Sequence, residues 1–193
     1  ALVGRKVERP FRRLPYAEAM EKYGSDKPDL RVPLEMRDLT AAAAGSGAEI
    51  LKAVASGGGE VKGLLVPGAG SLSRGQLDKL GDKARSLGAK GLIWIKKQDG
   101  WKSSLKTAEA DYERIWEVLG GGDTDLALVV ADRKETAIKA LGEIRRTWPV
   151  EDAARRDSLA FCWVTDFPLF EWSEEEKRFV SMHHPFTAPR EED

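Results

Sequence analysis

Residues 61–80 read VKGLLVPGAGSLSRGQLDKL, and this stretch decides the fold because it joins a strand to a helix through a short turn. Its opening apolar run predicts a strand, which the following Pro-Gly pair closes. Ser73 and Gln76 stand at capping-box spacing, where each side chain accepts a hydrogen bond from the other residue's backbone amide. The helix that follows is expected to place these residues on one apolar face: Leu77, Leu80, Ala84 and Leu87.

The pairing of a strand with a helix recurs along the centre of the chain. Residues 91–96 (GLIWIK) predict a second strand. Residues 126–131 (LALVVA) predict a third, which lacks polar alternation and is therefore expected to be buried on both faces or nearly so. Thr107 and Asp132 are expected to cap the helices that follow them, and Asp132 forms a second capping-box pattern with Glu135.

The apolar faces of these helices set the expected architecture, because each such face must cover a sheet. For the central residues 32–149 we predict an α+β domain of two layers, an antiparallel sheet with helices on one face. Periodicity alone leaves a doubly wound parallel sheet as the alternative. Shorter elements are expected towards the ends: a helix at 15–23 with Gly24 as its C-cap, and strands at 159–164 and 179–186.

The bulk composition limits the classes of function. Hydrophobic residues make up 41% and charged residues 33% of the 193, a balance typical of a folded soluble domain. The net charge of -1 supplies no global field for nucleic acid, so any RNA contact has to be local. The single cysteine, Cys162, excludes an internal disulfide framework and fits a reducing cytoplasm. No apolar run approaches the roughly 20 residues that span a bilayer.

His183 and His184 are the only histidines of the chain. Neighbours on a strand point to opposite faces, so the pair is not expected to bind one metal ion, and no acidic residue stands at helical metal spacing from either. A histidine can donate a hydrogen bond to a carboxylate or phosphate, and its charge is tunable near neutral pH. The alternative is a partly buried structural histidine.

Two loops and two tryptophans give weaker evidence for a binding site. Residues 24–29 (GSDKPD) fit a substrate or tRNA contact, or a solvated turn. Residues 67–73 (PGAGSLS) precede a helix N-terminus that can bind an anion, but they lack the Gly-Lys-Ser/Thr ending of a phosphate loop, which favours a plain strand-to-helix connection. Trp94 and Trp101, with lysines around them, fit stacking on single-stranded RNA, whereas core packing is the commoner use of a tryptophan in a strand.

Two terminal blocks resemble one enzyme family. Residues 11–31 read FRRLPYAEAMEKYGSDKPDLR, and residues 161–189 read FCWVTDFPLFEWSEEEKRFVSMHHPFTAP. Both resemble bacterial-type aspartyl-tRNA synthetase, and the centre resembles that family's inserted GAD domain, which an amidotransferase subunit shares. The resemblance implies a catalytic-domain segment at 1–31, a GAD insertion domain at 32–155 and a second catalytic-domain segment at 156–193. The two terminal segments are then expected to lie side by side as parts of one split antiparallel sheet.

The resemblance also implies an activity and a site. The family is a class II synthetase, usually a homodimer, that activates aspartate with ATP and Mg²⁺ and transfers it to tRNA. The MHHPF block implies that His183 contacts bound aspartate, with His184 as the second choice. Ser25, Asp26 and Lys27 belong to a family hallmark that has no contact assigned to it, and a hinge between the catalytic core and the insert fits them equally well. Both an enzyme specific for tRNA-Asp and one that also charges tRNA-Asn fit the resemblance.

The chain departs from the family pattern at its ends. The motif-2 and motif-3 arginines, which hold the α-phosphate and ATP, and the anticodon-binding domain fall outside these 193 residues. We therefore expect this polypeptide alone to form no adenylate and to hold no cofactor, metal ion or catalytic residue of its own. The alternative function is a GAD module that binds tRNA or a protein without catalysis, as in the amidotransferase subunit, and the two terminal blocks argue against that subunit as the source.

Overall fold

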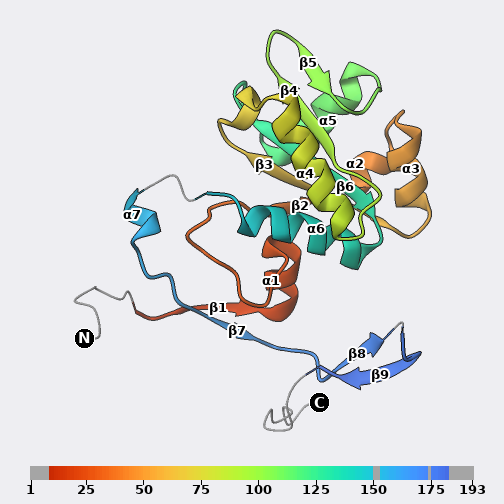
Figure 1. The fold of residues 1–193 in the computed structure, drawn as a ribbon. Coiled ribbons are helices and arrows are strands. Elements are labelled where there is room, and N and C mark those ends of the chain that lie inside the picture. Colours follow the sequence, from red (N-terminus) through yellow and green to blue (C-terminus); the bar gives the residue numbers. More distant parts are fainter. Residues whose placement is uncertain (1–8, 150–152, 174, 183–193) are drawn as a thin grey trace.

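The computed structural model describes residues 9–149, 153–173 and 175–182. Its larger unit is built on a five-stranded sheet, and a smaller unit of four strands lies beside it (Figure 1). The strands of the large sheet run in the order β2 (Met36–Asp38), β3 (Glu60–Val66), β6 (Leu126–Asp132), β4 (Ile93–Lys97) and β5 (Trp101–Ser103). Every neighbouring pair is antiparallel. The predicted α+β class is confirmed, and the parallel alternative is wrong.

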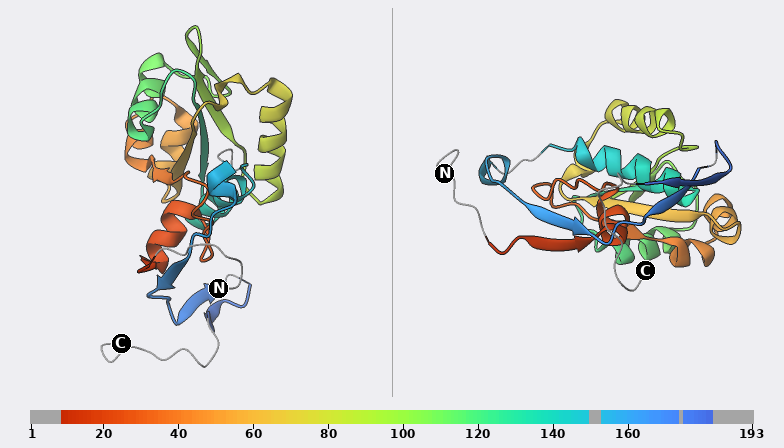
Figure 2. Two further views of the ribbon diagram at one scale, coloured as in Figure 1. Left: turned by 90° about the vertical axis from the view of Figure 1, so that its left-hand side faces the viewer. Right: turned by 90° about the horizontal axis from the view of Figure 1, so that it is seen from below.

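Helices cover both faces of the large sheet, as the right-hand view of Figure 2 shows. One face carries α4 (Arg74–Ser86) and α6 (Lys134–Arg146). The other face carries α2 (Thr40–Ala44), α3 (Glu49–Ser56) and α5 (Glu109–Leu119). The domain therefore has three layers, and the prediction that all helices lie on one face is wrong.

The central strand β6 explains the third layer. Leu126, Leu128 and Val130 pack into the core beneath α4 and α6, whereas Ala127 and Val129 pack into the core beneath α3 and α5. All five side chains are fully buried, as the lack of alternation in this strand predicts. An apolar strand in the middle of a sheet needs cover on both faces, so one layer of helices cannot suffice.

The N-terminal helix caps follow the sequence in one case out of three. Ser73 and Gln76 form the predicted capping box of α4, with the Ser73 amide 2.9 Å from Gln76 Oε1. The first residues of α5 and α6 instead follow Ala108 and Arg133, which make no side-chain cap. Asp132 ends β6 and accepts hydrogen bonds from the backbone amides of Lys90, at 3.0 Å, and Arg133, at 2.8 Å. Its carboxylate therefore ties β6 to the lead-in of β4, and the predicted cap of α6 is wrong.

The smaller unit contains the segments on either side of the large one. Strand β1 (Arg12–Pro15) runs directly into α1 (Tyr16–Tyr23), which ends at Gly24 in the left-handed conformation, φ 70°, as predicted. Helix α7 (Ala153–Arg156) leads towards β7 (Cys162–Thr165). A hairpin of β8 (Phe170–Ser173) and β9 (Arg178–Ser181) follows, so the two predicted C-terminal strands exist with shifted bounds.

Candidate functional site

The segments before and after the large unit form one small sheet. Strands β1 and β7 pair in parallel, and Leu14 lies opposite Val164. Leu14 is fully buried against Ala19 and Tyr23 of α1, with Val164 packed on the same cluster. A parallel pair needs a crossover connection, and here the whole five-stranded unit supplies it. The expectation that the two terminal segments lie side by side is therefore met, while their pairing is parallel and not antiparallel.

The far side of this small sheet presents aromatic side chains to solvent. Trp163 is 59% exposed and Phe161 is 53% exposed. Phe161 contacts the ring of Phe11 at 5.5 Å between centroids. The hairpin adds three more exposed rings: Phe170, Trp172 and Phe179. A concentration of exposed aromatic side chains indicates an interaction surface.

The predicted aspartate ligands His183 and His184 lie outside the described residues. The last described residue before them is Met182, whose backbone amide donates to the carbonyl of Leu169 at 2.9 Å. The histidine pair therefore comes directly after a hairpin that is closed by this hydrogen bond.

The turn at residues 24–29 lies near the small sheet. Ser25 Oγ accepts a hydrogen bond from the Lys27 amide at 3.0 Å, and the Lys27 side chain is exposed. The Tyr16 ring contacts Phe167 at 5.0 Å between centroids. Burial raises the pKa of Tyr16, and the charges of Glu171 and Asp26 raise it further. Charges of the turn and of the hairpin thus both act on Tyr16, and the hairpin directly precedes the histidine pair in sequence.

An ion cluster centred on the buried Lys62, which no sequence pattern predicted, connects α1 to the large sheet. The Lys62 side chain is 2% exposed and donates to Glu21 of α1, and its Nζ lies 3.2 Å from Asp38 Oδ2 and 3.1 Å from Glu60 Oε2. Lys134 also pairs with Glu21 and Glu60. Burial would lower the pKa of Lys62, but the three carboxylates outweigh it and raise that pKa well above its ordinary value. The one sequence feature that could have indicated this cluster is Lys62, a charged residue inside the apolar run 61–66.

The glycine-rich loop at 67–73 is a strand-to-helix connection closed by the protein itself. The amide of Gly68 donates to Asp125 Oδ1 at 2.9 Å, and the amide of Gly70 donates to the Thr124 carbonyl at 2.8 Å. Lys96 Nζ donates to two loop carbonyls, at 2.9 Å and 3.1 Å. Because these amides already have partners, the loop does not present them as an anion site.

The two strand tryptophans serve different faces of the sheet. Trp101 packs into the core, 5.4 Å from Trp116 between ring centroids. Trp94 points to the opposite face, where Arg74 lies 5.8 Å and Lys96 lies 5.9 Å from its ring centre. The two tryptophans therefore cannot stack together on one RNA strand. Only Trp94, with Arg74 and Lys96 beside it, remains a candidate for stacking on an RNA base.

A pocket of about 640 Å³ opens between α3 and β4. Apolar side chains including Val54 and Leu92 line it, and Lys90 and Arg133 add cationic groups. Its carboxylate, from Asp132, already accepts two backbone hydrogen bonds. This pocket therefore suits binding of a small group better than acid–base catalysis.

The described part of the chain contains neither a cluster of metal ligands nor a helix that could span a membrane. Among residues 9–149, 153–173 and 175–182, no group of three or more His, Cys, Asp or Glu side chains lies close enough to hold a metal ion. None of the helices within those ranges is long and apolar enough to cross a membrane.

Comparison with known proteins finds similarity both at the centre of the chain and along almost its whole length. A family model described as the GAD domain matches residues 50–141. An aspartate–tRNA(Asp/Asn) ligase of Thermodesulfovibrio yellowstonii is 47% identical over 189 residues, which cover 97% of this chain and 32% of that protein. An aspartate–tRNA ligase of Clostridium botulinum (strain Eklund 17B) is 41% identical over 197 residues, which cover 100% of this chain and 33% of that protein.

A further relative shows similar identity and similar coverage. The aspartate–tRNA(Asp/Asn) ligase of Caldanaerobacter subterraneus is 44% identical over 192 residues, which cover 95% of this chain and 32% of its own length. The chain thus spans about a third of the length of the curated relatives it matches. The chain is therefore similar along almost its whole length to about a third of an aspartate–tRNA ligase, and its centre matches the GAD domain.

Proposed function

We propose that these residues are part of an aspartate–tRNA ligase that activates aspartate with ATP and Mg²⁺ and then transfers it to tRNA. The pairing of β1 with β7 supports this most directly, because it joins the segments before and after the GAD domain into one sheet. In this proposal, residues 1–31 and 156–193 belong to the catalytic domain and residues 32–155 are the insertion. The enzyme would act in the cytoplasm as a homodimer, where protein synthesis consumes its product.

In the proposed site, His183 contacts the bound aspartate and His184 is the second choice. A protonated histidine makes a charge-assisted hydrogen bond to a carboxylate, which is stronger and more selective than a neutral one. The support is positional: the pair follows the hairpin directly, and the hairpin's Glu171 is near Tyr16 of α1.

The test is aspartate-dependent pyrophosphate exchange by the full-length protein. Loss of one charge-assisted hydrogen bond in His183→Ala should raise KM for aspartate by about 10- to 100-fold. Lys79→Ala, an exposed site on α4, is the control and should leave KM unchanged. A full-length protein without aspartate-dependent exchange would refute the proposed activity.

We expect the 193-residue chain alone to give no exchange, because the resemblance places the family's phosphate-binding arginines outside its residues. Adenylate formation depends on such groups and Mg²⁺ to stabilise the developing charge. Measurable turnover by this polypeptide would contradict the expectation. The relatives differ in the tRNA that their names state, tRNA(Asp/Asn) for one group and an unspecified tRNA for another. Charging assays with tRNA-Asp and tRNA-Asn would assign this protein to one of them.

A second candidate function is a binding module that contacts tRNA weakly. The specific support is Trp94, which is partly exposed and flanked by Arg74 and Lys96. Stacking of a base on an aromatic ring contributes roughly 1–3 kcal/mol. A gel shift of the 193-residue chain with tRNA should therefore weaken in Trp94→Leu and persist in Trp172→Leu. If no binding occurs at micromolar tRNA, the GAD domain does not contribute to tRNA binding.

A further inference from the structure

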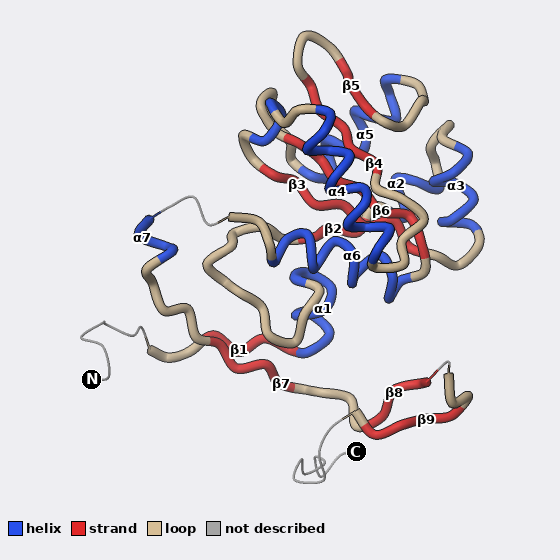
Figure 3. Tube along the Cα trace, in the orientation of Figure 1, coloured by secondary structure: helices blue, strands red, loops and turns tan. Residues whose placement is uncertain are grey.

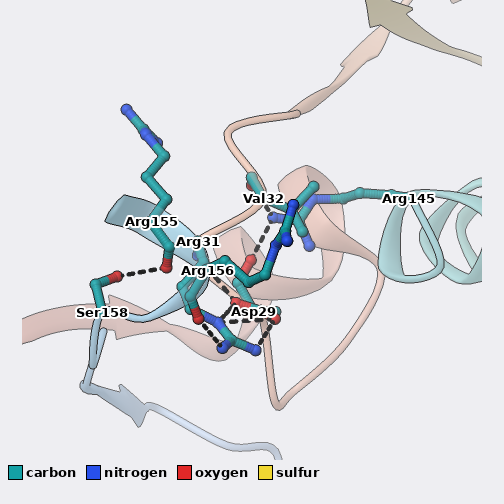
Figure 4. Close-up of polar contacts among 7 residues, drawn as sticks. All are labelled: Asp29, Arg31, Val32, Arg145, Arg155, Arg156 and Ser158. Carbon is teal, nitrogen blue, oxygen red and sulfur yellow. Dashed lines mark hydrogen bonds and ion pairs between the residues drawn. The ribbon is translucent and has the colours of Figure 1, made fainter. Parts of the chain in front are cut away.

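Two stretches of chain connect the small sheet to the GAD domain, and one arginine holds the first of them. The entry stretch, residues 24–35, runs from α1 to β2 as a loop (Figure 3). Arg145, in the last turn of α6, is 1% exposed and reaches into this loop. Its Nε donates to the Leu34 carbonyl at 2.5 Å. Its Nη2 donates to the carbonyls of Asp29, at 2.8 Å, and Val32, at 2.7 Å (Figure 4).

The entry stretch depends on Arg145 for backbone hydrogen bonds. Residues 24–35 form neither helix nor strand in the described chain, so a ladder does not satisfy their carbonyls. The guanidinium of Arg145 also lies 4.7 Å from the centre of the Tyr23 ring, at the end of α1. Burial lowers the pKa of Arg145, yet a guanidinium stays charged, and its planar set of donors can reach three carbonyls at once.

A second arginine ties the entry stretch to the exit stretch, which comprises the described residues 147–149 and 153–161 between α6 and β7. Arg31 pairs with the carboxylate of Asp29, with its Nε 2.9 Å from Oδ1 and its Nη2 2.7 Å from Oδ2. The same guanidinium donates through Nη1 to the carbonyl of Arg156, in α7, at 3.1 Å (Figure 4). Asp29 therefore binds two arginines, Arg145 through its carbonyl and Arg31 through its carboxylate. These contacts connect α6, the entry stretch and the exit stretch.

A close backbone contact lies beside these arginines. A Cβ placed on Gly24 would stand 2.5 Å from the Cα of Gly142 in α6, and a Cβ placed on Gly142 would stand 2.7 Å from the Cα of Gly24. Two glycines thus let the end of α1 rest on α6 without side chains between them.

We propose that Asp29, Arg31 and Arg145 form a joint that fixes the orientation of the GAD domain relative to the β1–β7 sheet. The chain motif YGSDKPDLR, at residues 23–31, then has a positioning role, and its Asp29 and Arg31 are structural ligands of the joint. Connections between domains commonly allow relative motion, whereas both connections are held here. The GAD domain therefore keeps one orientation relative to the β1–β7 sheet. This inference does not depend on the proposed catalytic activity.

Limited digestion of the 193-residue chain with trypsin tests the joint, because the Arg31–Val32 bond lies inside it. Lys27 is followed by proline, so the nearest bond that trypsin can cut in this loop follows Arg31. In Arg145→Met the loop loses three hydrogen bonds and should open more often, so cleavage after Arg31 should be about tenfold faster or more. Arg146→Met is the matched control, since Arg146 is exposed and pairs with Glu143 on its own helix.

A second variant keeps the test decisive if Arg145→Met does not fold. Arg145→Lys retains the charge but cannot span three carbonyls, so it should still fold, as the thermal transition will show, and should be cut after Arg31 faster than the wild type. Spin labels at Ala17→Cys and Lys79→Cys, in a Cys162→Ser background, report the distance between α1 and α4. We expect one narrow distribution in the wild type and a broader one in Arg145→Lys. Cleavage rates and distance distributions equal to those of Arg146→Met would overturn the proposal.

Discussion

The two sheets of this protein differ in how much of their apolar surface they bury. In the GAD domain, β6 lies between two layers of helices, and Leu128 and Val129 on its opposite faces are both fully buried. In the small sheet, α1 covers one face of β1 and β7, and Trp163 on the other face is 59% exposed. The hairpin repeats this pattern, with Phe179 67% exposed.

This difference shows which region can be stable by itself. The GAD domain has helices on both faces of its sheet, and the buried residues of its two cores lie within residues 32–144. The small sheet has a comparable share of apolar residues in its strands but lacks a second covering layer in the described residues. Its exposed aromatic surface is the type that another part of a protein, or a partner, commonly covers. The GAD domain should therefore dominate the free energy of unfolding of this chain.

Matched truncations in the two sheets give the largest expected contrast. Leu128→Ala removes a fully buried side chain from the centre of the GAD domain and should lower the free energy of unfolding by about 4 kcal/mol. Phe161→Ala removes a ring that is 53% exposed in the small unit, and should cost less than about 1 kcal/mol. Urea denaturation measures both. Equal losses would show that the small sheet is as well packed as the GAD domain.

The contact between the two regions can be broken at Gly24. Gly24→Ala places a side chain at φ 70° and within 2.5 Å of the Gly142 backbone, so α1 must move away from α6. We expect a loss of about 3 kcal/mol, since the left-handed backbone alone costs about 1–2 kcal/mol. Gly58→Ala is the control: φ is 79° there, but a Cβ would meet nothing within 4 Å. If both variants lose the same stability, the helix contact contributes nothing beyond backbone strain.

The ion cluster centred on Lys62, between the regions, should give a smaller loss that depends on pH. Lys62→Met leaves Lys134 as the cation of Glu21 and Glu60 and removes the ion pair of Asp38, and it should cost about 2 kcal/mol at neutral pH. Partial burial opposes ionisation of Glu21, but hydrogen bonds from Lys134 and Lys62 outweigh it and lower the pKa of Glu21. For Asp38, hydrogen bonds from Thr40 and Lys62 likewise outweigh burial and lower its pKa.

The sign of the pH effect follows from these directions. Each carboxyl has a folded-state pKa below its ordinary value, 4.5 for Glu21 and 3.8 for Asp38. Their contribution is complete above those values and is lost as the pH falls through the lower folded-state pKa. Denaturation between pH 3 and 7 should therefore show a steeper loss in the wild type than in Lys62→Met, with Lys79→Met as the exposed control. Parallel pH profiles would contradict the role of Lys62.

The sequence predicted local features well and long-range partners badly, for a physical reason. The strand at β6 and the Ser73 capping box depend on neighbouring residues, and both are as predicted. Periodicity shows that a helix has an apolar face, but it cannot show which face of the sheet that helix covers. The burial of Arg145 depends on a carbonyl at Leu34, 111 positions away, and this partnership has no local signal. The histidine pair was found by resemblance to a family and lies outside the described residues.

The smallest expected effect separates a true cap from a false one within the GAD domain. Ser73→Ala should cost about 1 kcal/mol and speed hydrogen exchange in the first turn of α4, because Ser73 caps that helix. Asp132→Ala should instead speed exchange at the amide of Lys90, which donates to Asp132, and leave the amide of Glu135 unchanged. The two variants differ because Ser73 belongs to its helix and Asp132 belongs to the sheet. Faster exchange at Glu135 with no change at Lys90 would show that Asp132 does cap α6 in solution.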